Sequence, residues 1–370
     1  MASENASKID ILVDAWGYND LLNEPTFEEL PYYIHVFVGI FISVLLLLGC
    51  LVCFGLLWVH KTLSRYLIDP SGLLLINFLV ANLATVTLQV PFSATSSFFG
   101  KWIFGGIGCQ MYAAIGFVSG ISSIFSLFLL VLEFYLYTEK TRLSLTYFQK
   151  SAKDRGFLHL KWIFGQWIVA LLLTGPPLMG TLGRMHVAPF GTMCTIDYWH
   201  GNFKNYRAYM TVLMINGFFT PFMVMSGVYF RGLQNLVKHE RSRSPLSKFE
   251  HKHIVGMAKL CAIGFVNVIF AWSPFFLLCL YTLIAGAHDL SVFATLIPPM
   301  VAKVKKISDL KLFSNKGFFS KFAPFLNGMA VIFAVPRIET ALRWMRTNRS
   351  QLTLSNQITT PPRQLWLNQE

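Results

Sequence analysis

Two lysines near the C-terminal end of the chain have surroundings in which an amine could act as a nucleophile. Lys321 lies in an almost uncharged apolar stretch with phenylalanines on both sides, and Lys303 directly follows the apolar residues 297–302. A lysine in apolar surroundings loses its proton more readily than one in water, and the neutral amine can add to an aldehyde and form an imine. The other interpretation is that either lysine snorkels, with its stem in lipid and its ammonium group in water. Lys311 and Lys316 fit this second interpretation.

The elements that position these lysines are long apolar segments. The chain of 370 residues is 54% hydrophobic and 13% charged, which excludes a disordered chain and argues against a soluble enzyme. Seven runs approach or exceed the roughly 20 residues that cross a bilayer as a helix. They span residues 33–59, 71–93, 107–137, 160–182, 207–230, 254–285 and 317–335. An eighth stretch, residues 290–302, is shorter and contains two prolines, so it resembles a re-entrant or lid-like segment. The sequence predicts an all-α membrane protein with a bundle of seven transmembrane helices, and not an enzyme.

The distribution of charge indicates how the bundle is oriented. The first thirty residues carry seven acids and one lysine, whereas basic residues cluster after the first, third and fifth runs and in the tail. Positive loops face the cytoplasm, so we predict an extracellular N-terminus, a cytoplasmic C-terminus and an odd number of crossings in the cell membrane. The predicted parts are an outer tail at 1–30, a membrane domain at 31–346 and an inner tail at 347–370. Asn5 starts a glycosylation acceptor on the outer side. The net charge of +13 is then a topology signal, and no nucleic acid is expected as a partner.

The six cysteines divide into two groups by position. Four fall inside apolar runs and are expected to be small core residues: Cys50, Cys53, Cys261 and Cys279. Cys109 lies at the outer start of the third run, and Cys194 lies in the outer loop between the fourth and fifth runs, where the compartment is oxidising. We predict a disulfide between Cys109 and Cys194. It would hold this loop across the mouth of the bundle and favour a buried apolar ligand. No metal site is predicted.

The energetic cost of burying charge separates the two lysines. A helix that took Lys303 into the bilayer would take four further charged residues toward its centre, at about 2.5–3.5 kcal/mol each. Residues 317–335 carry a single charge, Lys321, and continue into an amphipathic stretch at 336–345, which predicts a short eighth helix on the membrane surface. We therefore prefer Lys321 as the nucleophile and keep Lys303 as the alternative. This choice makes about residues 288–316 an insertion before the last helix.

Several motifs together resemble the rhodopsin-like (class A) G-protein-coupled receptors, and within them the opsins, over about residues 30–345. Residues 271–274 read Ala-Trp-Ser-Pro, where the family's sixth helix has its Cys-Trp-x-Pro turn, and residues 191–198 resemble an opsin second-loop strand. Further matches to family positions are Trp102, Trp167, Pro176, Pro177, Pro221 and Tyr229. Lys303 ends a family-like stretch, whereas Lys321 precedes Asn327 by six residues, the interval that opsins show. The resemblance therefore does not decide which of the two lysines corresponds to the seventh-helix lysine of the family.

The resemblance implies a ligand and the residues that hold it. Opsins bind 11-cis-retinal, an aldehyde, through a Schiff base on a seventh-helix lysine, here Lys321 or alternatively Lys303. Trp272, Phe275 and Tyr112 are the other expected retinal-binding residues, and Pro221 and Pro274 would open their helices locally as hinges. Two nearby aromatic residues are expected to fill helix contacts instead: Phe270 and Phe276.

The counterion of a retinal Schiff base has no acidic candidate at the family positions. Tyr112 and Ala188 occupy those positions, and Asp197 is the nearest loop carboxylate by sequence. A buried cation without a partner is costly. We therefore predict an unprotonated imine that absorbs in the near ultraviolet.

The signalling motifs depart from the family pattern. Glu133, Phe134 and Tyr135 stand where the family has Asp/Glu-Arg-Tyr, so Phe134 replaces the arginine of the cytoplasmic switch. Asn327 keeps the asparagine of the seventh-helix motif. Other departures from family residues are Cys50, Asn82, Gly328 and Val331. The resemblance implies a heterotrimeric G protein as partner, and Phe134 puts ordinary activation of it in doubt.

Three hypotheses follow. The first is a photoreceptor that couples light absorption to G-protein signalling, with a Ser/Thr-containing tail that offers phosphorylation sites and so an arrestin partner. The second is a retinal photoisomerase or chromophore-binding protein that does not signal, which Phe134 favours. The third is a receptor for a soluble ligand, in which both lysines are incidental.

Overall fold

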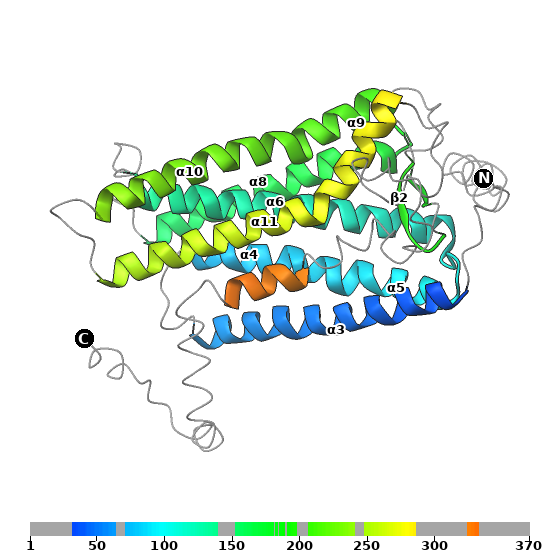
Figure 1. The fold of residues 1–370 in the computed structure, drawn as a ribbon, viewed down its shortest axis with the longest axis horizontal. Coiled ribbons are helices and arrows are strands. Elements are labelled where there is room, and N and C mark those ends of the chain that lie inside the picture. The colour runs from blue at the N-terminus through cyan, green and yellow to red at the C-terminus, as the bar shows by residue number, and fades with distance from the viewer. Residues whose placement is uncertain are drawn as a thin grey trace, which may run out of the picture.

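The computed structural model describes residues 32–63, 71–139, 152–180, 182–183, 185–188, 191–197, 206–240, 248–285 and 324–332. Long helices run side by side along the molecule, and a small β-hairpin lies at one end of them (Figure 1). Within these ranges, six helical spans are long and apolar enough to cross a membrane. The spans are formed by α3 (Tyr32–Leu63), α4 (Ser71–Ala84) with α5 (Val90–Phe98), α6 (Gly105–Thr138), α8 (Ala152–Leu178), α9 (Tyr206–Met214) with α10 (Thr220–Glu240), and α11 (Lys248–Ala285).

Two of the spans contain a short π-helix, and each is followed by a proline. The segment η1 (Thr85–Gln89) joins α4 to α5 and precedes Pro91, and η2 (Ile215–Phe219) joins α9 to α10 and precedes Pro221. Proline lacks an N–H and clashes with the carbonyl four residues earlier, so the preceding turn widens. The predicted opening at Pro221 is thus confirmed. At Pro274 the helix α11 continues without interruption, although it changes direction along its length (Figure 1).

A seventh helical segment at residues 324–332 completes the bundle. It packs closely on α3, because a Cβ atom added to Gly328 would lie 2.3 Å from a methyl carbon of Val52. Figure 1 shows it in orange between α3 and α11. The described part is shorter than the predicted run 317–335, and residues 317–323 and 333–335 lie outside the described residues. The all-α bundle of seven helices is the predicted fold.

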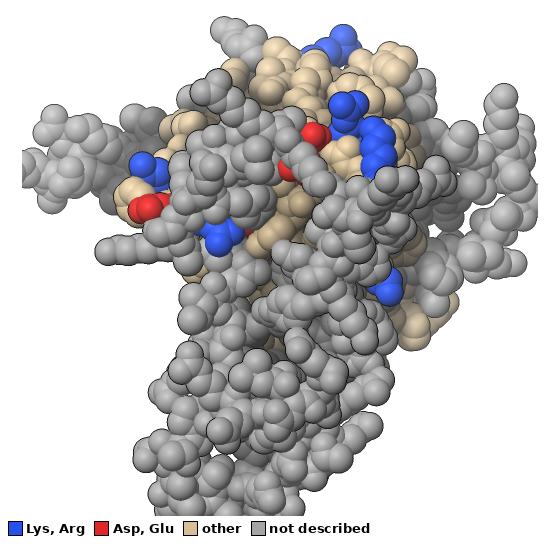
Figure 2. All heavy atoms as spheres, turned by 90° about the vertical axis from the view of Figure 1, so that its left-hand side faces the viewer, with Lys and Arg blue, Asp and Glu red and all other residues tan. Residues whose placement is uncertain are grey.

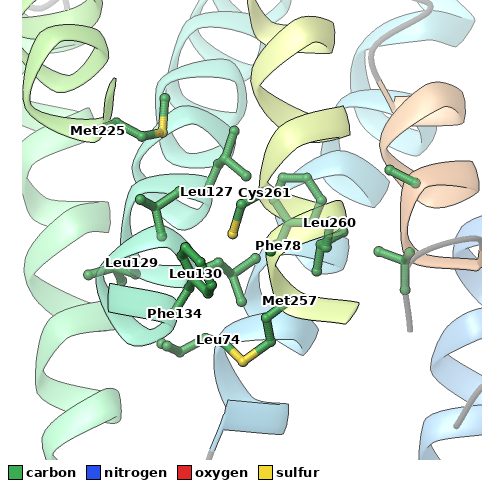
Figure 3. Packing of buried hydrophobic residues seen from close by; sticks show 14 of the residues in the cluster. Leu74, Phe78, Leu127, Leu129, Leu130, Phe134, Met225, Met257, Leu260 and Cys261 are labelled. Carbon is green, nitrogen blue, oxygen red and sulfur yellow. The ribbon is translucent and has the colours of Figure 1, made fainter. Parts of the chain in front are cut away.

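The helix α6 is the central element, because it contacts α4, α8, α10 and α11. Two clusters of buried apolar side chains surround it, one toward the β-hairpin and one toward the opposite end. Figure 3 shows part of the second cluster, which includes Leu127, Phe134 and Met257. The outward faces of the other helices are apolar and exposed: Leu51 is 70% exposed, Phe164 70% and Leu172 69%. So much exposed apolar surface is unfavourable in water and suits lipid contact.

Candidate functional site

A β-hairpin covers one end of the bundle. Its strands β1 (Met185–Val187) and β2 (Cys194–Ile196) are antiparallel, with Val187 opposite Cys194, and Gly191 in the connecting turn has a positive φ of 80°. Cys194 forms a disulfide with Cys109 in the first turns of α6, as predicted. The remaining four cysteines form no disulfide; Cys53, Cys261 and Cys279 are buried and Cys50 is partly buried, in agreement with their predicted core role. The hairpin is therefore fixed to the central helix.

An apolar cavity lies between α6, the α9–η2 segment and α11. Its lining comes from three places in the chain: Phe117, Ile121 and Ile124; Leu213, Met214, Gly217 and Phe218; and Trp272, Phe275 and Phe276. The side chains of these ten residues contain a single nitrogen or oxygen atom, the indole nitrogen of Trp272. The cavity measures about 30 Å³, which is room for about two water molecules.

Trp272 owes its position on this wall to a glycine on α6. A Cβ atom added to Gly120 would lie 2.3 Å from Cζ2 and 2.5 Å from Cη2 of Trp272, so the ring occupies space that any side chain at this position would fill. Phe275 meets Phe117 across the cavity with ring centroids 5.8 Å apart in an edge arrangement. The sequence thus placed Trp272 and Phe275 correctly on the wall, and Gly120 was missed.

Phe276 differs from the prediction that it only fills helix contacts. It lines the cavity and stacks on Phe218 with centroids 4.8 Å apart. Because it follows Trp272 by four residues, it lies on the same face of α11 one turn later, and this spacing was the available signal. Phe270 is 48% exposed and lies outside the cavity.

The walls fit an extended apolar ligand in their chemistry, while the volume is small. Ligand pockets usually measure about 300–1,000 Å³, and the cavity measures about 30 Å³. A ligand of that size therefore requires wall side chains to move apart. Met214 is unbranched and flexible, and the stacked rings of Phe218 and Phe276 meet across an interface between helices rather than within one helix.

Tyr112 is buried, at 2% exposure, in an aromatic cluster outside the cavity lining. Its ring centroid lies 5.3 Å from that of Trp102 and 6.4 Å from that of Phe92. Gln89 reaches the same turn of α6 from η1, where its Nε2 donates to the Tyr112 carbonyl at 3.4 Å. Asp197 directly follows β2 and is fully buried. None of the ten residues that line the cavity is an acid. The acid near the hairpin is Asp197.

A network of buried amides crosses the middle of the bundle. Asn327 Nδ2 donates to Asn82 Oδ1 at 2.7 Å and lies 3.5 Å from Ser123 Oγ, and its Oδ1 accepts a bond from Asn267 Nδ2. The network links the 324–332 segment to α4, α6 and α11 with neutral groups only. Asn327 is therefore inside the bundle. Asn267 was missed, although an amide within an apolar run is a visible signal.

The opposite end of α6 carries a buried acid with an unexpected partner. Glu133 Oε2 lies 3.3 Å from His159 Nε2 on α8, and both side chains are fully buried. The next residue, Phe134, is also fully buried, and Tyr135 is partly buried. The acid of the motif therefore pairs with the fourth span. His159 was missed, and its only signal was a histidine within an apolar helix.

The comparison with known proteins agrees with this arrangement. Residues 50–308 match the model of the 7 transmembrane receptor (rhodopsin family). The chain belongs to this receptor family. It is 29% identical over 364 residues to melanopsin of Phodopus sungorus, covering 92% of this chain and 74% of that protein. It is 25% identical over 281 residues to a GQ-coupled rhodopsin of Mizuhopecten yessoensis, covering 73% of this chain and 54% of that protein.

The fold of the receptor is similar to that in the crystal structure of squid rhodopsin. The TM-score is 0.72 at 20% sequence identity, with 91% of this chain and 88% of that chain covered. In receptor terms, Glu133, Phe134 and Tyr135 form the end of the third helix and Trp272 belongs to the sixth. Three predicted site residues lie outside the described residues: Lys303, Lys321 and Asn5.

Proposed function

We propose that this receptor is an opsin-type photoreceptor that binds retinal and couples light absorption to a heterotrimeric G protein. The observation that carries the proposal is the apolar cavity, which is lined by Trp272 packed against Gly120. The bundle that contains it is covered at one end by the disulfide-linked hairpin. A receptor for a soluble polar ligand needs convergent polar groups in its pocket, and the ten lining residues supply almost none. The names melanopsin and GQ-coupled rhodopsin among its relatives support the same function.

The residues proposed to hold retinal have different tasks. Lys321 is the proposed point of covalent attachment, because it precedes by six residues the Asn327 that lies inside the bundle, and Lys303 is the alternative. Trp272 and Phe275 would pack along the apolar ligand and exclude water. Retinal, in the 11-cis form, would supply absorption of light and a change of shape. A change of shape beside Trp272 would favour one packing of the helices over another.

The absorption maximum is proposed to lie in the near ultraviolet. The cavity walls offer no carboxylate, and Tyr112 lies in a separate aromatic cluster. A cation at the attached nitrogen would therefore lack a negative partner along these walls. Asp197 is buried beside the hairpin, outside the cavity lining, and is the carboxylate to test as a counterion.

The proposed orientation places the hairpin and the N-terminus outside the cell. The face at the end of the bundle opposite the hairpin carries several basic side chains and fewer acidic ones (Figure 2). Arg231 and Lys238, in the last part of α10, are exposed. Positive charge favours the cytoplasmic side. This end is the proposed docking face for the G protein and for arrestin. Residues 1–30 with glycosylated Asn5, 31–346 and 347–370 remain the proposed outer, membrane and inner parts.

Reconstitution of the full-length protein with 11-cis-retinal tests the proposal. We expect a retinal absorption band, covalent trapping by borohydride that is lost in Lys321→Ala and kept in Lys303→Ala, and light-dependent nucleotide exchange on an added G protein. Pigment that remains covalently trapped in the protein with both substitutions would refute the attachment. A band in the visible range at neutral pH would refute the near-ultraviolet assignment, and that band should move in Asp197→Asn if this carboxylate is the counterion.

A non-signalling photoisomerase is the second candidate function, and one observation favours it. Phe134 is fully buried where the family's arginine serves signalling. Under this alternative, the reconstituted protein would bleach and isomerise retinal in light without any nucleotide exchange on the G protein.

A further inference from the structure

Phe134 fits closely against a glycine on the neighbouring helix. Its side chain is fully buried, and a Cβ atom added to Gly232 of α10 would lie 2.6 Å from its Cε1, 3.0 Å from Cδ1 and 3.3 Å from Cζ. Carbon atoms normally approach to about 3.5–4.0 Å. The aromatic ring therefore occupies the space that any other residue at position 232 would need. Phenylalanine and glycine form a matched pair between α6 and α10.

The contact continues from α10 to α11 through Tyr229. The ring centroids of Phe134 and Tyr229 are 5.7 Å apart, and the Tyr229 hydroxyl donates a hydrogen bond to the Ala258 carbonyl of α11 at 3.2 Å. Phe134 also belongs to the buried cluster that contains Met257 and Cys261 of α11 (Figure 3). One apolar side chain thus connects the ends of three helices.

We propose that Phe134, Gly232 and Tyr229 form an apolar latch that keeps the cytoplasmic ends of α6, α10 and α11 together in the resting receptor. The inference rests on the proposed function for its effect on the G protein. None of the three latch residues carries a charge. The acid next to Phe134 in sequence, Glu133, is paired with His159 on α8. Ligand-driven movement of α11 must then break the Tyr229–Ala258 hydrogen bond and the packing of α11 in this cluster before a partner can enter.

Other contacts between α6 and α10 must be separated from the latch. Asn235 Nδ2 donates to Glu139 Oε2 at 2.9 Å, about one turn farther along α10, and a substitution at Gly232 leaves both groups in place. Gly227 offers a matched control, because a Cβ atom added there meets nothing within 4 Å and lies on the same helix. Gly232→Ala and Gly227→Ala therefore share the gain in helix propensity and differ in the clash with Phe134.

The test measures the distance between spin labels on α10 and α11 in the ligand-free receptor in lipid nanodiscs, together with nucleotide exchange on a G protein in the dark. The labels replace the exposed residues Lys238 and Lys259, in a background where the partly buried Cys50 is alanine. We expect Gly232→Ala to add a population with a longer distance between the labels on α10 and α11. The rate of nucleotide exchange in the dark should rise about fivefold or more, which is typical of allosteric coupling. Gly227→Ala should match the parent protein. Phe134→Leu combined with Gly232→Ala should return both readouts toward the parent, because the smaller side chain admits the added methyl group.

The outcomes separate the latch from the proposed function. If Gly232→Ala lowers the melting temperature but leaves the distance distribution equal to that of Gly227→Ala, the contact is merely structural and the latch is refuted. If Gly232→Ala shifts the distance and Phe134→Leu does not reverse the shift, the pairing of these two residues is refuted. If the distance shifts and reverses as expected while no variant, in light or dark, promotes exchange, the latch stands and the proposed coupling to that G protein fails.

Discussion

Replacing Gly120 by alanine tests whether Trp272 is held as the structure places it. The added Cβ would lie 2.3 Å from Trp272 Cζ2, so the indole must retreat by at least about 1 Å to reach an ordinary carbon contact. Overpacking of this kind costs about 1–3 kcal/mol, against a gain of about 1 kcal/mol from the higher helix propensity of alanine. Gly165→Ala on α8 is the matched control, because a Cβ atom there meets nothing within 4 Å.

Thermal unfolding of both variants in nanodiscs without ligand gives the first readout, and the yield of pigment with 11-cis-retinal gives the second. We expect Gly120→Ala to be less stable than Gly165→Ala by about 1–3 kcal/mol and to form less pigment. Trp272→Phe in the Gly120→Ala background should recover stability, because the smaller ring leaves room for the methyl group. Equal melting and equal pigment yield for the two alanine variants would show that the indole does not lie against position 120.

Three further predictions concern the contacts that hold the bundle. Glu133→Gln should destabilise the protein by about 1.5–3 kcal/mol, the usual contribution of a hydrogen bond to a charged group. A double-mutant cycle with His159→Asn, measured by thermal unfolding, should give a coupling energy above about 0.5 kcal/mol. Purely additive effects would argue against the pair. Cys109→Ser and Cys194→Ser should each cost about 2–5 kcal/mol, and the double variant should be no worse than either single one, as measured by melting and surface expression; additive losses would contradict a shared bond. Asn327→Leu should cost about 1–3 kcal/mol for each amide left without its partner, and thermal unfolding like that of the parent protein would contradict the network.

The helices were predictable from sequence because their signals are local, and the disulfide was predictable because the expected topology limits which cysteines can meet. Hydrophobic runs of about 20 residues report membrane crossing regardless of what they pack against. The pairing of Cys109 with Cys194 followed from the predicted topology, which puts both cysteines at the same end of the bundle. Trp272 was predictable as a wall residue because its size and its proline neighbour set it apart from the other aromatic residues of α11.

The missed residues depend on partners that are distant in sequence. Gly120 matters because Trp272 lies 152 positions away and needs its space, and an isolated glycine in a helix gives no hint of this. His159 gains its role from Glu133 on another helix, and Phe276 becomes a wall residue only when Phe218 is brought opposite to it. Periodicity identifies the face of a helix, but the identity of the neighbouring helix comes from tertiary packing.

The interior of this receptor is lined mainly by neutral or apolar groups, from the cavity through the amide network to the end of α6 opposite the hairpin. Among the described residues, the cavity has aromatic and aliphatic walls, the buried network consists of amides and hydroxyls, and the end of α6 opposite the hairpin presents Phe134 toward α10 and α11. Glu133 is the buried acid that the structure describes at that end, and its histidine partner lies on α8. Apolar contacts are short-ranged, so they are lost once side chains move apart by little more than a water diameter, whereas charges still interact across such a gap. A bundle held in this way should therefore switch on packing alone, and its resting state should depend on how closely Phe134 and Gly232 fit.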